Sequence, residues 1–283
     1  MNRLQRSLLA VVAAFVVSVG FAPLPALARD ARIQSAARPF DLDIVAPVQR
    51  RRSDTASTSF YRNELPIFSS LMGTDLNQQV STDSIATTLL DPANLVMQSD
   101  YNARAYFVGE DAGYHNTLGF NTQGTGISSG NPQLIFPDVS EGRRRSYTNP
   151  VKSGDFVELG NLSAGTKLDF FLIADGARGG RSVFSTNAST NPDSMRHIFA
   201  HAFTQPNSPY LMLAFEDMLG GGDQDYNDLL IAVDVGADNL NKMIKTVGAP
   251  EPSMLITMGT LVSIGVAYTR RKRKQRNEID DIE

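Results

Sequence analysis

Acidic side chains are concentrated between positions 216 and 228 of this 283-residue chain. Carboxylates crowded together repel one another, and this repulsion opposes folding unless a counterion relieves it. Ca²⁺ is a suitable counterion, because it takes roughly six to eight oxygen ligands from carboxylates, carboxamides and backbone carbonyls. The segment therefore predicts a calcium site with the candidate ligands Asp223, Asp225, Asn227, Asp228, Glu216 and Asp217.

The spacing of Asp223, Asp225 and Asn227 is the one-three-five pattern that opens an EF-hand loop. An EF-hand is nevertheless excluded, because Asp228 stands where that loop has its turn glycine and because strand patterns flank the segment. The alternative to a metal site is an acidic, solvated hairpin tip in which Asn and Asp only form turns.

Apolar residues alternate on both sides of the acidic segment, at Leu211, Leu213 and Phe215 and again at Leu229, Ile231, Val233 and Val235. Alternation with period two is typical of a half-buried strand. The three glycines at positions 220–222 allow the connection to adopt backbone angles that other residues resist. We therefore expect two strands that close on the acidic loop, so that Glu216 and Asp217 complete the ligand set from the opposite strand.

Further strand patterns occur at residues 103–109, 134–136, 155–159, 167–173 and 195–203. Together these short strands predict an all-β fold. Glu110 and Asp111 follow the first of them and are further candidate ligands from another strand. Asp175 lies in a glycine-rich loop and could also reach a metal, although an Asp in that position more often forms a turn.

Two motifs resemble catalytic or zinc-binding patterns but lack the context that these need. Residues 126–130 match the G-x-S-x-G pattern of serine hydrolases, yet neither the strand before it nor the helix after it is predicted. His197 and His201 have the spacing of zinc ligands on a helix, but they fall in a strand pattern, where four residues span about 13 Å. We expect both histidines to face solvent or a sheet edge.

The acidic segment also carries a family resemblance. Phe215-Glu216-Asp217, then Gly220-Gly221-Gly222-Asp223, then Asp225-Tyr226-Asn227-Asp228 resembles the hallmark of an uncharacterised bacterial domain family that occurs in secreted proteins and large surface adhesins. Residues 106–120, 134–138 and 159–171 resemble other parts of that domain, so the likeness covers about residues 95–235. The resemblance implies a β-rich, calcium-binding module without a known activity. With the strand patterns, it predicts an antiparallel β-sandwich that is jelly-roll-like.

The N-terminus has the features of a secretory signal. Arg3 and Arg6 precede an apolar run at residues 8–21, and Ala26-Leu27-Ala28 supplies the small residues of a cleavage site. A membrane helix that stays uncleaved is the alternative, but the prolines at positions 23 and 25 and the Ala-x-Ala site favour cleavage. We expect residues 1–28 to be removed on export.

The C-terminus has a proline-containing motif, an apolar run and a basic cluster. Pro250-Glu251-Pro252 precedes an expected transmembrane helix at residues 254–269, and Arg270, Arg271, Lys272, Arg273 and Lys274 follow it. The helix would be short for a bilayer, and the basic cluster should remain cytoplasmic.

This order resembles the PEP-CTERM sorting tail of exopolysaccharide-producing Gram-negative bacteria. That resemblance implies cleavage near residues 250–253 by an exosortase, a membrane transpeptidase-like enzyme, and a link to the biofilm matrix and extracellular polysaccharide. Thr257, Thr260 and Ser263 and the polar end at residues 277–283 depart from the pattern. An ordinary C-terminal anchor is the alternative.

Composition excludes two classes of protein. The formal net charge is -4 and 20% of residues are charged, without the basic stripe of a nucleic-acid-binding protein. The chain contains no cysteine, which excludes disulfides and thiol chemistry.

The patterns divide the chain into a signal peptide (1–28), a flexible leader with a short helical segment (29–90), a β-sandwich calcium-binding-type domain (91–236), a polar linker (237–249) and a sorting tail (250–276) before the polar end. We expect the helix in the leader to start at Asp83 or Ser84 and to stop at Asp91. The arginines at positions 50–52 are expected to form a solvated charge run.

The sequence thus predicts an exported, non-catalytic protein that is first membrane-anchored and then reaches the cell surface or the extracellular matrix. Its expected partners are an exosortase-type enzyme, the inner membrane and a polysaccharide or matrix protein. One alternative is a calcium-dependent, lectin-like protein that uses Tyr226 or Tyr114 against sugar. A second is a glycosidase with paired carboxylates such as Glu110 and Glu216.

Overall fold

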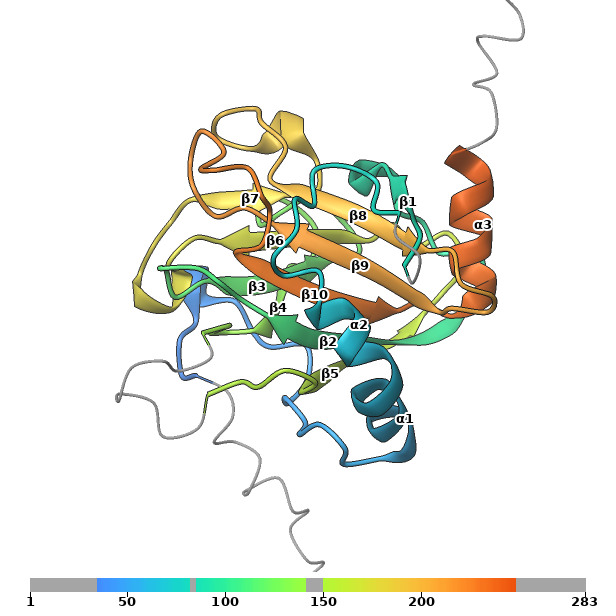
Figure 1. Cartoon of the computed structure of the whole chain (residues 1–283). Helices are drawn as coiled ribbons and strands as arrows, with labels where there is room; N and C mark the ends of the chain where they lie inside the picture. The colour runs from blue at the N-terminus through green and yellow to red at the C-terminus, as the bar shows by residue number, and fades with distance from the viewer. Residues whose placement is uncertain (1–34, 82–84, 141–149, 248–283) are drawn as a thin grey trace, which may run out of the picture.

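Ten strands form two antiparallel sheets in the part of the chain that the computed structural model describes, which is residues 35–81, 85–140 and 150–247 (Figure 1). The six-stranded sheet contains, in spatial order, β1 (Thr87–Leu90), β8 (Ile198–Phe203), β9 (Tyr210–Phe215), β10 (Leu229–Asp234), β2 (Tyr101–Gly109) and β5 (Phe156–Leu162). The four-stranded sheet contains β4 (Gln133–Phe136), β3 (Thr117–Asn121), β6 (Asp169–Ile173) and β7 (Val183–Ser185). The expectation of a mostly β, antiparallel structure is confirmed.

One hydrophobic core is shared by the two sheets. Phe107, Leu213 and Ile231 of the six-stranded sheet belong to the same buried cluster as Phe170 and Leu172 of the four-stranded sheet. Phe107, Leu213 and Ile231 lie opposite one another in neighbouring strands, and Phe170 and Leu172 are two positions apart in β6. Alternate side chains of a strand point to the same face of a sheet, so each set faces the shared core. The alternation read from the sequence therefore identified the face that forms this core.

Short helical elements cover the opposite face of the six-stranded sheet. They are α1 (Thr55–Ser59), the π-helix η3 (Phe60–Glu64) and α2 (Leu65–Ser69). Phe60 is fully buried, and its ring stacks on Tyr106 of β2 with a centroid distance of 3.9 Å. This cover explains why every residue of β9 is buried, whereas the sequence predicted a half-buried strand.

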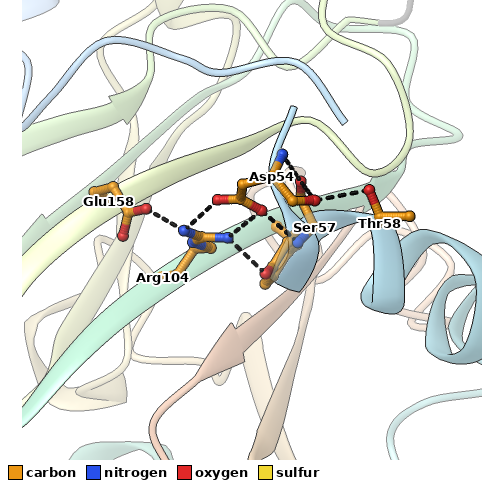
Figure 2. Close-up of polar contacts among 6 residues, drawn as sticks. Asp54, Ser57, Thr58, Arg104 and Glu158 are labelled. Carbon is orange, nitrogen blue, oxygen red and sulfur yellow. Dashed lines mark hydrogen bonds and ion pairs between the residues drawn. The ribbon is translucent and has the colours of Figure 1, made fainter. Parts of the chain in front are cut away.

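Arg104 of β2 joins these helices to the sheet (Figure 2). Its guanidinium forms ion pairs with Asp54, at 2.9 Å, and with Glu158 of β5. Asp54 also caps α1, because its side chain accepts a hydrogen bond from the backbone N–H of Ser57 at 2.7 Å. The Asp54 carboxylate therefore caps the N-terminus of α1 and also connects this helix to β2.

Residues 40–50 also pack on the sheets. Phe40, Leu42 and Ile44 contact the buried cluster that covers the outer face of the four-stranded sheet. Arg50 donates to the fully buried Asp155 at 2.7 Å, so this arginine is part of an internal ion pair and the expected solvated run is wrong there. Residues 35–81, expected to be a flexible leader, contribute buried side chains to the described structure.

Two elements differ from the sequence-based expectation. Residues 87–90 form strand β1, which pairs with β8, where a helix ending at Asp91 was expected; positions 83 and 84 lie outside the described residues. The polar linker contains α3 (Ala237–Val247), whose Leu240 and Met243 are buried against the shared core. The remaining short helices are η2 (Pro39–Asp41), η4 (Pro92–Asn94), η5 (Gly176–Arg178) and η6 (Ala188–Thr190).

The expected signal peptide and sorting tail lie outside the described residues, and so do Ala26, Ala28, Pro250, Glu251, Pro252 and the basic cluster at 270–274. Among the helices that the structure does describe, none has the length and apolar character needed to cross a bilayer.

Candidate metal centre

The acidic loop connects β9 to β10, which pair in register from Leu229 opposite Phe215. The ladder ends at this pair, so Glu216 and Asp217 leave β9 directly opposite the point where Asp228 enters β10. The backbone N–H of Asp217 donates to Asp228 Oδ2 at 2.8 Å, which closes the base of the loop. The predicted hairpin is confirmed.

The carboxylates of the loop form two groups that share Glu216. In the first, oxygens of Glu216, Asp223 and Asp225 lie within 4.8 Å of one another. In the second, the same limit holds for Glu216, Asp217 and Asp228. All five predicted acidic ligands of the loop therefore converge. The second group is the deeper one, because Glu216 and Asp217 are buried whereas Asp223 is exposed.

Asn227, the remaining predicted ligand, lies against one of these carboxylates. Its side-chain Nδ2 donates to Asp225 Oδ2 at 2.6 Å, and its backbone N–H donates to Asp225 Oδ1 at 3.2 Å. Asn227 therefore orients Asp225 within the first group.

Glu110 and Asp111 border the loop without joining either group. The Glu110 side chain accepts from the backbone N–H of Ala112 at 3.0 Å, and the Asp111 N–H donates to the carbonyl of Asn227 at 3.3 Å. Asp175 also lies outside both groups; its side chain accepts from the His115 N–H at 2.9 Å, which fits the alternative role of a turn former.

Asn116, in the connection between β2 and β3, positions the deeper group of carboxylates. Asn116 is fully buried and donates to Asp217 Oδ2 at 2.6 Å, while its carbonyl oxygen Oδ1 accepts from the backbone N–H of Asp175 at 3.0 Å. A carboxylate with one oxygen fixed in this way keeps the other oxygen in a defined direction. The sequence analysis did not single out Asn116, because its contact with Asp217 joins residues 101 positions apart.

His197 supports the first part of the loop, at Glu216 and, through Asp193, at Gly220. The expectation that His197 and His201 face solvent or a sheet edge is wrong, because both are fully buried and β8 lies between β1 and β9. The His197 ring stacks on Phe184 at 3.8 Å. Its Nδ1 lies 3.0 Å from the carbonyl oxygen of Glu216, and its Nε2 lies 2.9 Å from Asp193 Oδ2. Asp193 in turn accepts from the Gly220 N–H at 2.8 Å.

Tyr226 has an internal role. It is buried, adopts a positive φ of 60°, and donates its hydroxyl to the carbonyl of Arg196 at 2.9 Å. The expectation that Tyr226 could stack on a sugar is therefore not supported by its position. Tyr114 is 45% exposed. Residues 76 and 77 also hold the loop, because the Leu76 N–H donates to the carbonyl of Asp225 at 3.0 Å and Asn77 Nδ2 donates to the carbonyl of Gln224 at 3.0 Å.

The electrostatics of the site oppose ionisation of its acids. Burial, followed by the nearby Asp228, raises the pKa of Glu216 to about 8. Burial is also the main cause that raises the pKa of Asp217 to about 7, against the hydrogen bond from Asn116. The pKa values of Asp225 and Asp228 are raised by burial as well. Within the described residues, none of the five acids forms an ion pair with a basic side chain.

Glu216 also has an unsatisfied oxygen. Its side chain is 1% exposed, and Oε2 has no hydrogen-bond partner among the described residues. Buried acceptors without a donor are rare, and an ion that is not drawn in a structure is one recognised explanation. Hard oxygen donors, low exposure and uncompensated charge fit a Ca²⁺ ion at this place.

A family comparison covers this hairpin. Residues 162–236 match a family model described as "Domain of unknown function (DUF4114)". The matched segment begins at the end of β5 and includes β6 to β10, so it contains the acidic loop and His197 but excludes Asn116 and the helices at 55–69. No curated protein matches the chain, and no solved structure matches it.

Proposed function

We propose that the protein is an exported, non-catalytic cell-surface or matrix module whose β9–β10 loop binds Ca²⁺. The observation that carries this proposal is the unpartnered, buried Oε2 of Glu216 among four further carboxylates. A divalent cation removes both the repulsion between these acids and the missing partner of Glu216. Its binding would stabilise the folded hairpin, because the unfolded chain does not hold these carboxylates together.

We further propose that the two sheets form an antiparallel β-sandwich of the jelly-roll-like kind, which their shared core supports. Export and sorting are proposed from the sequence of the two ends: a cleaved signal at 1–28, and a PEP-CTERM-like tail recognised by an exosortase-type enzyme. The protein, which is adhesin-like, would then reach the cell surface or an extracellular polysaccharide matrix after a membrane-anchored stage.

Calcium-dependent glycan binding is the second candidate. Tyr114 favours it, because this aromatic side chain is 45% exposed and lies in the same loop as Asn116, which contacts Asp217. A glycosidase is not favoured, because that mechanism needs acids that reach a substrate and Glu216 is 1% exposed.

A thermal melt of the purified chain tests the calcium proposal. The protein is first stripped with EDTA and then titrated with CaCl2. At a Ca²⁺ concentration about 100 times Kd, binding to the folded state adds about 2.7 kcal/mol, which corresponds to a rise in Tm of roughly 5–10 °C. Asp225→Asn should reduce this rise. Asp41→Asn, which changes an exposed acid far along the chain, should keep it. An unchanged Tm in the wild-type protein contradicts the proposal.

A further inference from the structure

The two carboxylate groups share Glu216 but have different surroundings. Asp217 and Asp228 lie at the base of the hairpin, where the Asp217 N–H donates to Asp228 and Asn116 donates to Asp217. Asp223 and Asp225 lie in the outer turn, where Asp225 is held by Asn227. Because different elements fix each pair, the loop offers two ligand sets on either side of one carboxylate.

The Glu216 side chain is held where it can serve both sets. It is 1% exposed, and Gly222 packs so closely on it that a Cβ at Gly222 would overlap Oε1. Gly222 has a φ of 49°, in the left-handed region. The backbone therefore restricts Oε1 on one side, while Oε2 stays without a donor among the described residues.

The charge of the loop also exceeds what a single ion can neutralise. The five carboxylates of the two groups carry five formal negative charges when ionised. One divalent ion would leave three of these charges uncompensated in a place without an ion pair to a basic side chain in the described structure, and two ions would leave one. Repulsion between the buried Glu216 carboxylate and its neighbours is costly, so a second ion on the more exposed side of Glu216 adds stability that the first does not.

We propose that the loop binds two divalent cations bridged by the carboxylate of Glu216. An inner ion is held by Glu216, Asp217 and Asp228, and an outer ion by Glu216, Asp223 and Asp225. The inference rests on the proposed calcium function and specifies its stoichiometry and ligands. The inner ion is expected to exchange more slowly, because two of its three acidic ligands are buried, whereas Asp223 is exposed to solvent.

Equilibrium dialysis of the purified chain with radioactive Ca²⁺ tests the stoichiometry. The wild-type protein and the control Asp41→Asn should each bind two ions. Asp225→Asn should keep only the inner ion and Asp217→Asn only the outer one. Glu216→Gln should weaken both sites by at least about tenfold, as expected for the loss of a charged ligand. Circular dichroism and a melt of each variant establish that it is folded.

The outcomes separate this inference from the proposed function. A single ion in the wild-type protein, lost in both Asp217→Asn and Asp225→Asn, overturns the two-ion site and leaves the calcium function standing. The absence of any bound ion overturns both.

A measurement on the wild-type protein avoids dependence on variants that fail to fold. Eu³⁺ and Nd³⁺ replace Ca²⁺, and energy transfer between them reports their separation. Ions bridged by one carboxylate lie about 4 Å apart, so transfer should be nearly complete. Its absence in protein loaded with both lanthanides overturns the bridge.

Discussion

The buried carboxylate of Glu216 should have opposite effects on stability with and without metal. In the metal-free protein, Glu216→Gln removes a carboxyl group whose ionisation burial and Asp228 disfavour in the folded state, so the variant should melt higher than the wild type. With saturating Ca²⁺ the order should reverse, because the variant lacks a shared ligand. Paired melts in EDTA and in CaCl2 measure this crossing. A variant that is less stable in both conditions would show that Glu216 has only a packing role.

The clustering of the acidic side chains could be predicted from the sequence, whereas the residues that position them could not. The acids of the loop stand close together in the chain, so their composition alone indicates a common site. Asn116 and His197 reach the same loop through tertiary contacts. The alternation around His197 correctly indicated a strand, but it could not show that Phe184 of the other sheet stacks on the His197 ring.

At the scale of the loop, Gly222 and Gly220 form a matched pair for substitution. Both have a positive φ, at 49° and 83°, so an alanine is strained at either position. Only at Gly222 does a new Cβ meet the Glu216 carboxylate; at Gly220 it meets no atom within 4 Å. Gly222→Ala should therefore weaken Ca²⁺ binding at least about tenfold, or about 1.4 kcal/mol, while Gly220→Ala changes it little. Calorimetric titration compares the two, and equal affinities would contradict the close packing.

The stability of the protein should depend on pH, because strand β8 contains the buried, titratable side chain of His201. Burial lowers the pKa of His201 below its usual 6.5, and Nε2 lies 2.9 Å from the carbonyl oxygen of Leu76. The folded protein thus keeps the ring neutral in a range where the unfolded chain binds a proton. The stabilisation that the neutral His201 ring contributes is fully present above pH 6.5. It is lost as the pH falls toward the lowered pKa of the folded state.

The measurement is the Tm of the wild-type protein and of His201→Gln between pH 7.5 and pH 5. The Gln amide can still donate to Leu76, and it does not titrate. The wild type should lose several degrees more than the variant on acidification. Parallel curves would mean that another group causes the decrease.

Helix α3 and strand β1 are elements that the sequence patterns did not predict. Leu240, Met243 and Ile244 have helical spacing, a signal that the polarity of residues 237–249 obscured. β1 is only four residues long and has no clear alternation, so its pairing with β8 decides its conformation. Short elements of this kind take their structure from neighbours that are distant in sequence.

At the scale of the molecule, residues 35–81 are expected to be necessary for folding. Phe60→Ala removes a fully buried ring that contacts Tyr106, Phe68 and Tyr210, and it should lower the free energy of unfolding by about 3–5 kcal/mol. The partly exposed Tyr61→Ala is the neighbouring control and should cost about 1 kcal/mol. Urea denaturation measures the free energy of unfolding of both variants. Equal, small losses would mean that this segment is a leader that folding does not need.

The position of β2 between β10 and β5 determines the order in which the chain can assemble. Strands β8, β9 and β10 follow one another in sequence and in space, so they can associate through local contacts soon after folding starts. Pairing of β2 with β10 must first close a loop of more than a hundred residues, which makes folding slow. The acidic turn belongs to the early, local part. If the loop binds Ca²⁺ as proposed, a chain that folds in a calcium-rich medium would capture the ion before its sheet is complete, and the ion would favour the hairpin onto which β2 docks.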